Sequence, residues 1–325
     1  MDDEKMTSLV KIGEGVYGEV FKYEAEDGDV SIIKVVPMEG DCRVNDEPQK
    51  RFHEMKKEIL VTKTLSELGY NFVTTKRVVC TQGKYPEILL NKWDDYATHK
   101  VSENDRPDYF STDQHYTVFE FSDGGEPLES YKFGSAAEGL SCLLQTGWTL
   151  AVAEDAHQFE HRDLHWSNIL ISSQDNPPSQ EYQFRSCGSK YSISTASIKV
   201  NIIDFTLSRM LKGEDVIFCD LSEDETLFQG YGDYQFDVYR QMKAATGNNW
   251  RMFHSVTNVY WMKYLADKIL KTKTFPGKRG SKPSVTTFKK DLMNFCDRCS
   301  DYYSAIQMVL TDPLFTEYST QHQSP

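Results

Sequence analysis

Residues 9–36 constrain the fold more than any other stretch of this 325-residue chain. The segment LVKIGEGVYGEVFKYEAEDGDVSIIKVV alternates apolar and polar residues, and glycines interrupt it. Alternation with a period of two is typical of strands that bury one face, and glycines between such runs indicate tight turns. We therefore expect three consecutive strands near the N-terminus.

The pattern changes several times between this segment and residue 121. Residues 47–68 have helical periodicity, with a predicted apolar face of Phe52, Met55, Ile59 and Leu60. We expect two further strands at EILLNKW (87–93) and YTVFEF (116–121), with a long polar loop between them. These elements predict a β-rich N-terminal part.

A break at SDGGEPLES, which begins at Ser122, separates this part from a helical one. Leu140, Leu144 and Trp148 recur at four-residue spacing, which predicts a buried helix. Short strands are expected at NILIS and SIKVNIIDF, a polar linker between them, and mostly helix after about residue 234. The sequence thus predicts an α+β protein divided into 1–121, a hinge at 122–125, and 126–325.

Bulk composition excludes some classes of protein. The net charge of −13 disfavours general binding to nucleic acid, because phosphate contacts need clustered Lys and Arg. The basic loop 271–284 could contact nucleic acid, but a solvated loop is the preferred interpretation. No apolar run reaches the ~18 residues of a membrane helix, and the acidic N-terminus lacks the apolar core of a signal peptide. We expect a soluble intracellular protein.

The seven cysteines do not suggest a metal site or a disulfide framework. Cys296 and Cys299 form a C-x-x-C pair in a stretch that looks helical, but no second pair completes a zinc site. We expect reduced, structural thiols.

The N-terminal strands contain parts of a phosphate-binding site. Gly13, Gly15 and Gly18 form G-x-G-x-x-G, and glycine lets a backbone approach phosphates closely. A dinucleotide-binding motif would continue into a helix, whereas EVFKYEA alternates like a strand. Lys34 lies among β-formers, so it is either a cation for nucleotide phosphates or an edge-strand lysine that reaches solvent. Its expected partner is Glu58, with Glu54 as the alternative.

The second half of the chain contains residues suited to the acceptor and to a metal ion. Asp163 and Asn168 are five residues apart in EHRDLHWSN, and Asp204 ends an apolar strand. Asp163 would orient the acceptor hydroxyl, while Asn168 and Asp204 would bind Mg²⁺, since hard cations prefer oxygen ligands. Each residue alone could be an ordinary cap. All of them in this order predict phosphoryl transfer.

With these parts placed, the chain resembles eukaryotic protein kinases, and within them the haspin family. The motifs that carry the resemblance are EHRDLHWSN, IIDFTLSR and FCDLSEDETLFQGYGDYQFDVYR. Protein kinases usually carry Lys at the position of His165 and Gly at the position of Thr206. Haspins carry His and Thr at these positions, so the two differences do not indicate an inactive enzyme. The resemblance implies a bilobal kinase fold with a small β-rich N-lobe and a larger helical C-lobe.

The resemblance also implies an activity and a location. It implies a serine/threonine kinase that uses ATP and Mg²⁺ and phosphorylates a threonine in the basic N-terminal tail of histone three. It further implies a monomer without direct nucleic-acid or membrane binding, located in the nucleus and on chromosomes during division, with the cytoplasm as the alternative.

The family's site residues carry over by motif. Lys34 and Glu58 are the paired lysine and helix glutamate, and Phe121 is the gatekeeper. Asp237 is the aspartate that braces the catalytic loop, EHRDLHWSN (160–168). The implied nucleotide-binding set is Ile12, Gly13, Gly15, Gly18, Val20, Lys34, Glu58, Phe121, Ser122, Asp123 and Gly124.

The implied peptide groove is acidic, which offers a functional explanation for the net charge of −13. Glu129, Asp224 and Asp233 match groove positions that would face a cationic tail. Thr226 and Tyr231 stand where the family often has acids, so the peptide specificity can differ. Ile32 stands where kinases usually have Ala over the adenine, and this bulk can tighten the nucleotide pocket.

Two other classes stay open. A small-molecule kinase of the aminoglycoside or choline type carries H-G-D-L-H-x-x-N, which resembles HRDLHWSN, but Arg162 and the full glycine motif disfavour it. A pseudokinase that acts as a binding module is disfavoured by the retained Lys34, Asp163, Asn168 and Asp204.

Overall fold

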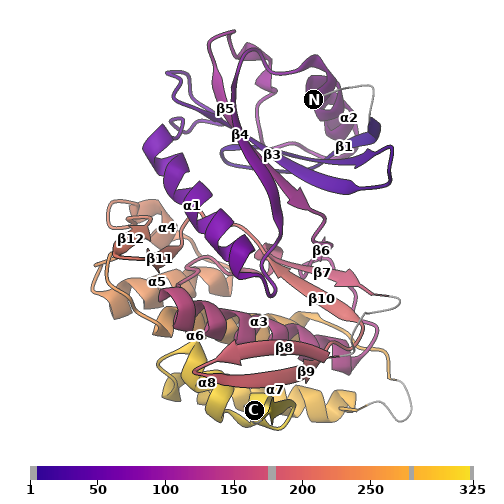
Figure 1. Ribbon diagram of the computed structural model, residues 1–325, viewed down its shortest axis with the longest axis vertical. Helices are drawn as coiled ribbons and strands as arrows, with labels where there is room; N and C mark the ends of the chain where they lie inside the picture. Colours follow the sequence, from indigo (N-terminus) through magenta and orange to yellow (C-terminus); the bar gives the residue numbers. More distant parts are fainter. Residues whose placement is uncertain (1–5, 175–180, 278–281, 323–325) are drawn as a thin grey trace. The chain divides into compact units, whose positions relative to one another are not determined.

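The computed structural model describes residues 6–174, 181–277 and 282–322 (Figure 1). Two compact units divide the chain: residues 1–67 with 73–123, and residues 68–72 with 124–325. The α+β class expected from the sequence is confirmed, with a β-rich first unit and a mainly helical second unit.

A five-stranded antiparallel sheet forms the centre of the first unit, in the order β1-β2-β3-β5-β4. Its strands are β1 (Met6–Gly15), β2 (Gly18–Ala25), β3 (Val30–Met38), β4 (Thr75–Gln82) and β5 (His115–Ser122). The three N-terminal strands and the strand at YTVFEF are confirmed. β4 was missed, because its side chains are mostly exposed and give little apolar alternation.

The predicted strand at EILLNKW is wrong: these residues begin helix α2 (Glu87–His99). Leu89, Trp93 and Tyr96 recur at helical spacing, but a window that ends at Trp93 is too short to show the period. The predicted loop after it is shortened by the rest of α2 and by the 3-10 turn η2 (Pro107–Tyr109).

Helix α1 (Phe52–Leu68) packs on the sheet through a face that overlaps the predicted one at Met55 and Ile59. Met55 is fully buried with Val36 and Phe119 of the sheet, whereas Phe52 is half exposed. The buried face continues through Val61 and Leu65. Glu58 lies on this same buried face, which places a carboxylate beside the sheet.

The second unit is built around helix α3 (Ala136–His157), which is buried along nearly its whole length, as its apolar spacing predicted. Ser135 caps its first turn by accepting a hydrogen bond from the Glu138 amide, and the Glu138 carboxylate accepts one from Gly134 N at 2.7 Å. The other helices are α4 (Glu225–Gln229), α5 (Tyr234–Thr246), α6 (Val256–Thr272), α7 (Val285–Arg298), α8 (Ala305–Thr311) and α9 (Pro313–Thr316), with the 3-10 turns η3 (Trp166–Asn168) and η4 (Cys299–Asp301). No helix in the described parts of the chain is long and apolar enough to span a bilayer.

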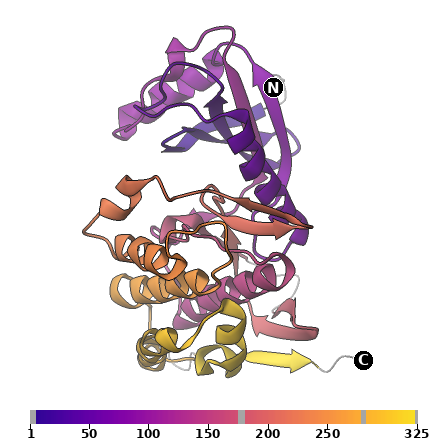
Figure 2. The same cartoon turned by 90° about the vertical axis from the view of Figure 1, so that its left-hand side faces the viewer.

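Three small sheets complete the second unit (Figure 2). They are β10-β7-β6, β11-β12 and β13-β9-β8, formed by β6 (Glu126–Pro127), β7 (Ile169–Ser173), β8 (Glu181–Ser186), β9 (Ser189–Ser194), β10 (Ile198–Ile202), β11 (Arg209–Lys212), β12 (Asp215–Phe218) and β13 (Ser319–His322). Strands β7 and β10 confirm the predicted ones. The predicted linker between them contains most of a hairpin, β8–β9, against which the C-terminal strand β13 pairs.

Candidate active site

The glycine motif forms the tip of the β1–β2 hairpin in the first unit, where Gly15 pairs with Gly18. A Cβ added to Gly18 would lie 2.1 Å from Val35 O, so this glycine is required for the close approach to β3. Gly13 and Gly15 have no other heavy atom within 4 Å of an added Cβ. Their backbone is therefore open to a ligand, which suits a phosphate-covering role.

The other predicted nucleotide residues of the first unit lie on the same sheet. Val20 pairs with Lys34 across β2 and β3, and Ile32 pairs with Phe121 across β3 and β5. Ile12 is 41% exposed beside the hairpin tip, Ser122 ends β5, and Asp123 forms an ion pair with Lys22 at 2.6 Å. Gly124 belongs to the second unit, where its carbonyl accepts a hydrogen bond from Asn201 Nδ2 at 2.9 Å.

The structure pairs Lys34 with Glu58, at 3.2 Å between Nζ and Oε1. A second lysine shares this carboxylate: Lys50 Nζ lies 3.0 Å from Glu58 Oε2. Lys50 also lies over the ring of Tyr17 at the hairpin tip, 4.7 Å from its centroid. No sequence pattern indicates Lys50, because it precedes α1 and reaches Glu58 only through the fold.

In the second unit, the loop after α3 brings Asp163 and Asn168 together. Asn168 Nδ2 donates to Asp163 O at 2.8 Å and lies 3.2 Å from His165 Nε2. Because the side-chain nitrogen of Asn168 makes these two contacts, its amide oxygen is the atom that can bind a cation. Burial lowers the pKa of His165, which favours the neutral ring that accepts this hydrogen bond.

Asp204 reaches the same region because of strand register. Strands β7 and β10 are antiparallel and pair Ile169 with Ile202, so the start of β7 and the end of β10 lie at one edge. Asn168 directly precedes Ile169, and Asp204 follows Ile202 by two residues. The Ile203 amide also donates to Asn168 O at 3.1 Å.

The donor set of these two residues fits Mg²⁺. A carboxylate and an amide oxygen are hard ligands, and Mg²⁺ commonly uses one or two carboxylates together with substrate phosphates. Among the described residues no group of three or more His, Cys, Asp or Glu side chains could hold a metal ion. This is compatible with a site that is completed by the nucleotide.

Tyr239 of α5 is a site residue that the sequence did not reveal. Its hydroxyl donates a short hydrogen bond to Asp163 Oδ1. The pKa of Asp163 is raised to about 8, chiefly because the carboxyl is buried; the Tyr239 hydrogen bond lowers it and the Asp204 carboxylate raises it. A cation at Asp204 would favour the ionised form of Asp163.

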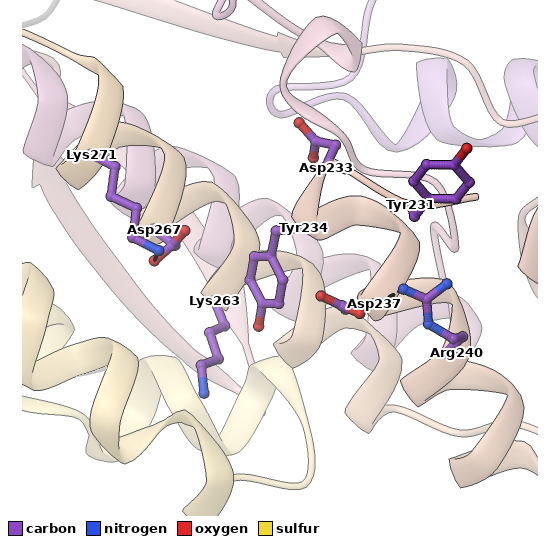
Figure 3. A pocket seen from close by; sticks show the side chains of 9 residues that line it. Tyr231, Asp233, Tyr234, Asp237, Arg240, Lys263, Asp267 and Lys271 are labelled. Atoms are coloured by element: carbon purple, nitrogen blue, oxygen red, sulfur yellow. Dashed lines mark hydrogen bonds and ion pairs between the residues drawn. The ribbon is translucent and has the colours of Figure 1, made fainter. Parts of the chain in front are cut away.

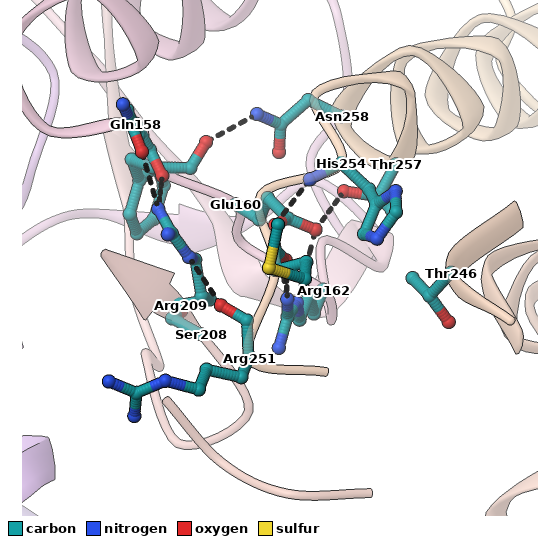
Figure 4. Close-up of polar contacts among 12 residues, drawn as sticks. Gln158, Glu160, Arg162, Ser208, Arg209, Thr246, Arg251, His254, Thr257 and Asn258 are labelled. Carbon is teal, nitrogen blue, oxygen red and sulfur yellow. Dashed lines mark hydrogen bonds and ion pairs between the residues drawn. The ribbon is translucent and has the colours of Figure 1, made fainter. Parts of the chain in front are cut away.

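The catalytic loop is braced by Asn258 of α6, and the predicted role of Asp237 is wrong (Figure 4). The His161 amide donates to Asn258 Oδ1 at 3.1 Å, and Asn258 Nδ2 donates to Phe159 O at 2.8 Å. Asp237 pairs instead with Arg240, one turn along its own helix, and its side chain is 57% exposed. The identification failed because Asp237 lies on the exposed face of α5, whereas Asn258 is buried on α6 and contacts the loop.

A buried ion pair fixes the arginine of this loop (Figure 4). Arg162 Nη2 lies 3.0 Å from Glu160 Oε1, and both side chains are fully buried. Glu160 also accepts hydrogen bonds from His254 N and Thr257 Oγ1, each at 2.9 Å. Glu160 therefore neutralises the charge of Arg162 within the same loop.

A family model and several known proteins resemble this chain along most of its length. The family model described as "Haspin like kinase domain" matches residues 1–302. The chain belongs to the haspin-like kinase family. It is 41% identical to the serine/threonine-protein kinase haspin of Bos taurus over 324 residues, which are 97% of this chain and 41% of that protein.

Two further haspin relatives give similar values. The mouse protein is also 41% identical over 97% of this chain and 42% of its own length. The Arabidopsis thaliana homolog is 40% identical over 95% of this chain and 51% of its own length. The chain thus spans about half the length, or less, of these curated relatives.

The three predicted groove acids of this haspin-like chain all have partners within the second unit. Glu129 accepts a hydrogen bond from Ser167 Oγ at 2.8 Å, and Asp224 accepts one from Thr226 Oγ1 at 2.6 Å. Asp233 caps α5 and forms a short ion pair with Lys268. A cationic peptide would therefore have to compete with Lys268 for Asp233.

A cavity of about 450 Å³ opens beside Asp233, between α5 and α6 (Figure 3). Its charged side chains balance: Asp237 pairs with Arg240, and Asp267 pairs with Lys271 at 2.8 Å. Tyr231, which is 89% exposed, lies at its edge. The cavity holds none of the residues assigned to phosphoryl transfer.

Proposed function

We propose that this chain is a serine/threonine protein kinase that transfers the γ-phosphoryl group of ATP, with Mg²⁺, to a hydroxyl of a protein substrate. The observation that carries this proposal is the convergence of Asp163, Asn168 and Asp204 at one edge of the β7–β10 pair. In the first unit, the pairing of Lys34 with Glu58 supports it.

Each residue has a distinct role in the proposed reaction. Lys34, oriented by Glu58, would hold the nucleotide phosphates beneath the glycine hairpin. Asn168 and Asp204 would hold Mg²⁺, which when bound offsets the charge of the phosphates. Asp163, oriented by Tyr239, would accept or orient the proton of the acceptor hydroxyl.

We further propose that the acceptor is a threonine in the basic N-terminal tail of histone three, and that the protein acts as a monomer in the nucleus and on chromosomes. The net charge of −13 and the acids Glu129, Asp224 and Asp233 support a cationic substrate. The internal partners of these acids mean that recognition would depend on exchange of ion pairs, and not on free carboxylates alone.

A transfer assay with labelled ATP and Mg²⁺ tests the proposal. The acceptors are a histone-three tail peptide, the same peptide with the threonine replaced by alanine, choline, an aminoglycoside, and none. We expect label only in the threonine peptide and none with the Asp163→Asn variant. Label in choline or the aminoglycoside would favour the small-molecule kinase, and no label with any acceptor would favour the pseudokinase.

A further inference from the structure

The segment that follows α2 touches the glycine hairpin at several points, all within the first unit. Asn104 Nδ2 lies 3.0 Å from Gly15 O and 2.8 Å from Glu19 Oε1. The Glu14 carboxylate accepts hydrogen bonds from Ser102 Oγ at 2.8 Å and from Glu103 N at 2.7 Å. These hydrogen bonds contact the hairpin at Glu14, between Gly13 and Gly15, and at Glu19 on β2.

A second asparagine, Asn45, contacts the tip of the hairpin. Asn45 Nδ2 donates to Val16 O at 2.9 Å, and Asn45 Oδ1 accepts from the Asp105 amide at 2.8 Å. Asn45 therefore links the hairpin tip to the segment 102–105. These contacts use the carbonyl oxygens of Gly15 and Val16 and no backbone N–H of the hairpin, so they do not consume the groups that bind phosphate.

Beneath the tip lies a buried lysine. Lys11 of β1 has a fully buried side chain and forms ion pairs with Glu14 at 2.5 Å and with Glu19 at 2.7 Å. Its ammonium also lies 4.3 Å from the ring centroid of Tyr96 and 5.0 Å from that of Trp93, both on α2. A buried lysine is costly unless it is paired, so this arrangement favours one position of Glu14 and Glu19.

The segment 102–105 is itself anchored at its far end. Arg106 forms a two-point ion pair with Asp94 of α2, at 2.8 Å and 2.9 Å. Pro107 and Phe110 are buried, and Phe110 stacks on Tyr85 in the core of this unit. The segment can therefore act as a rigid support.

We propose that residues 102–105 and Asn45 form a clamp that holds the glycine hairpin in its nucleotide-binding conformation, with Asn104 and Asn45 as positioning residues for ATP. The inference rests on the proposed kinase function. Glycines lose more conformational freedom on ordering than other residues, so a hairpin with three of them would be costly to order on binding. A hairpin ordered in advance avoids that cost and binds more tightly.

Two variants test the clamp. Asn104→Ala removes the donor to Gly15 O and Glu19. Asn45 has φ of 49°, which glycine tolerates, so Asn45→Gly removes its side chain without adding backbone strain. The matched controls are Asn91→Ala, an exposed residue of α2, and Asp46→Gly, which has φ of 65° beside Asn45.

The readouts are the Kd of ATP by calorimetry, hydrogen exchange of residues 13–18 in the free protein, and urea unfolding. We expect each clamp variant to raise the Kd of ATP about tenfold, to speed exchange at the hairpin, and to leave the KM of the peptide unchanged. The controls should match the wild type. A loss of stability with unchanged Kd and unchanged hairpin exchange would overturn the clamp.

The clamp and the proposed function can fail separately. If the wild type does not bind ATP, the kinase proposal fails, and hairpin exchange in the two variants still decides whether the clamp orders residues 13–18. If the wild type binds ATP but transfers no phosphate, the Kd comparison remains valid.

Discussion

At the scale of single residues, Glu58 is shared between two lysines, and the two should differ in function. Lys34 lies on β3 opposite Val20, whereas Lys50 lies before α1 and contacts Tyr17. We expect Lys34→Ala to lower kcat by orders of magnitude, because it removes the cation for the phosphates. Lys50→Ala should cost less than about tenfold, since Lys34 still orients on Glu58. Steady-state kinetics will show whether kcat falls further in Lys34→Ala than in Lys50→Ala. An equal loss of kcat in both variants would contradict the prediction.

Asp204 gives the second prediction at this scale. Asp204→Asn replaces a carboxylate ligand with a neutral amide of nearly the same shape, so phosphoryl transfer should be abolished while the fold persists. Transfer with Mg²⁺ and ATP is measured beside the urea midpoint. Turnover near that of the wild type would remove Asp204 from the metal site.

At the scale of elements, the segment 207–232 is ordered by its own contacts. Its buried anchors include Leu221 and Phe228, and its hairpin β11–β12 begins at Arg209, whose Nη1 donates to Gln158 O at 2.7 Å. Arg162, a cation that a phosphate could otherwise attract, is neutralised by Glu160. Ser208 is buried and donates to His161 O, so it is poorly placed for modification.

We therefore expect full activity without phosphorylation of this segment. Protein expressed in a host without such kinases, with its unmodified state checked by intact mass, should transfer phosphate. Phosphatase treatment should change nothing. A chain that stays inert until another kinase treats it would refute this expectation.

At the scale of the whole molecule, stability should depend on pH through His161. Its Nδ1 accepts a hydrogen bond from the Asp163 amide and its Nε2 contacts Ile203 O, which fits a neutral ring. Burial lowers its pKa from 6.5 to about 4. Between these values the unfolded chain binds more protons at this residue, so the contribution of His161 to the free energy of unfolding is most favourable above pH 6.5. It should fall by on the order of 3 kcal/mol as the pH drops through about 4.

The measurement is urea unfolding at pH 7.5, 6 and 5 for the wild type and for His161→Gln. The variant should lose part of the pH dependence, and His99→Gln, at the exposed end of α2, should not. The His161 proton resonance of the wild type should also fail to titrate above pH 5. An unchanged slope in His161→Gln would contradict the assignment.

The acidic surface gives a further prediction for the whole molecule. Glu129→Lys and Asp224→Lys should raise the KM of the tail peptide about ten- to a hundredfold and leave the KM of ATP unchanged, because each reverses one charge next to the proposed cationic substrate. The difference in peptide KM between the wild type and these variants should shrink as the salt concentration rises, because salt screens exposed charges. Asp233→Lys should also lower stability, since Asp233 caps α5 and pairs with Lys268.

The control for these variants is Glu317→Lys, an exposed acid in the turn after α9. It changes the net charge by the same amount. Equal effects from Glu317→Lys would assign the salt dependence to overall charge. Unchanged peptide kinetics in all of the groove variants would defeat the acidic groove.

The features that depend on local order along the chain could be predicted from the amino-acid sequence. Alternation placed β1, β2, β3 and β5, four-residue spacing placed α3, and the five-residue spacing of Asp163 and Asn168 lies within one loop. The sequence also indicated the pairing of Lys34 with Glu58. Local periodicity was too short to identify α2 and too weak to identify β4.

The distant side chains that reach these residues could not be predicted, because they depend on how the whole chain packs. Tyr239 and Asn258 contact the catalytic loop from helices 76 and 97 residues away, and Asn104 reaches Gly15 across 89 residues. Motif matching predicts Asp237 for the role that Asn258 has, because a local motif does not show which side chain is buried beside a loop. A hydrogen bond needs atoms within about 3 Å, and packing of the whole chain sets that distance between residues far apart in sequence.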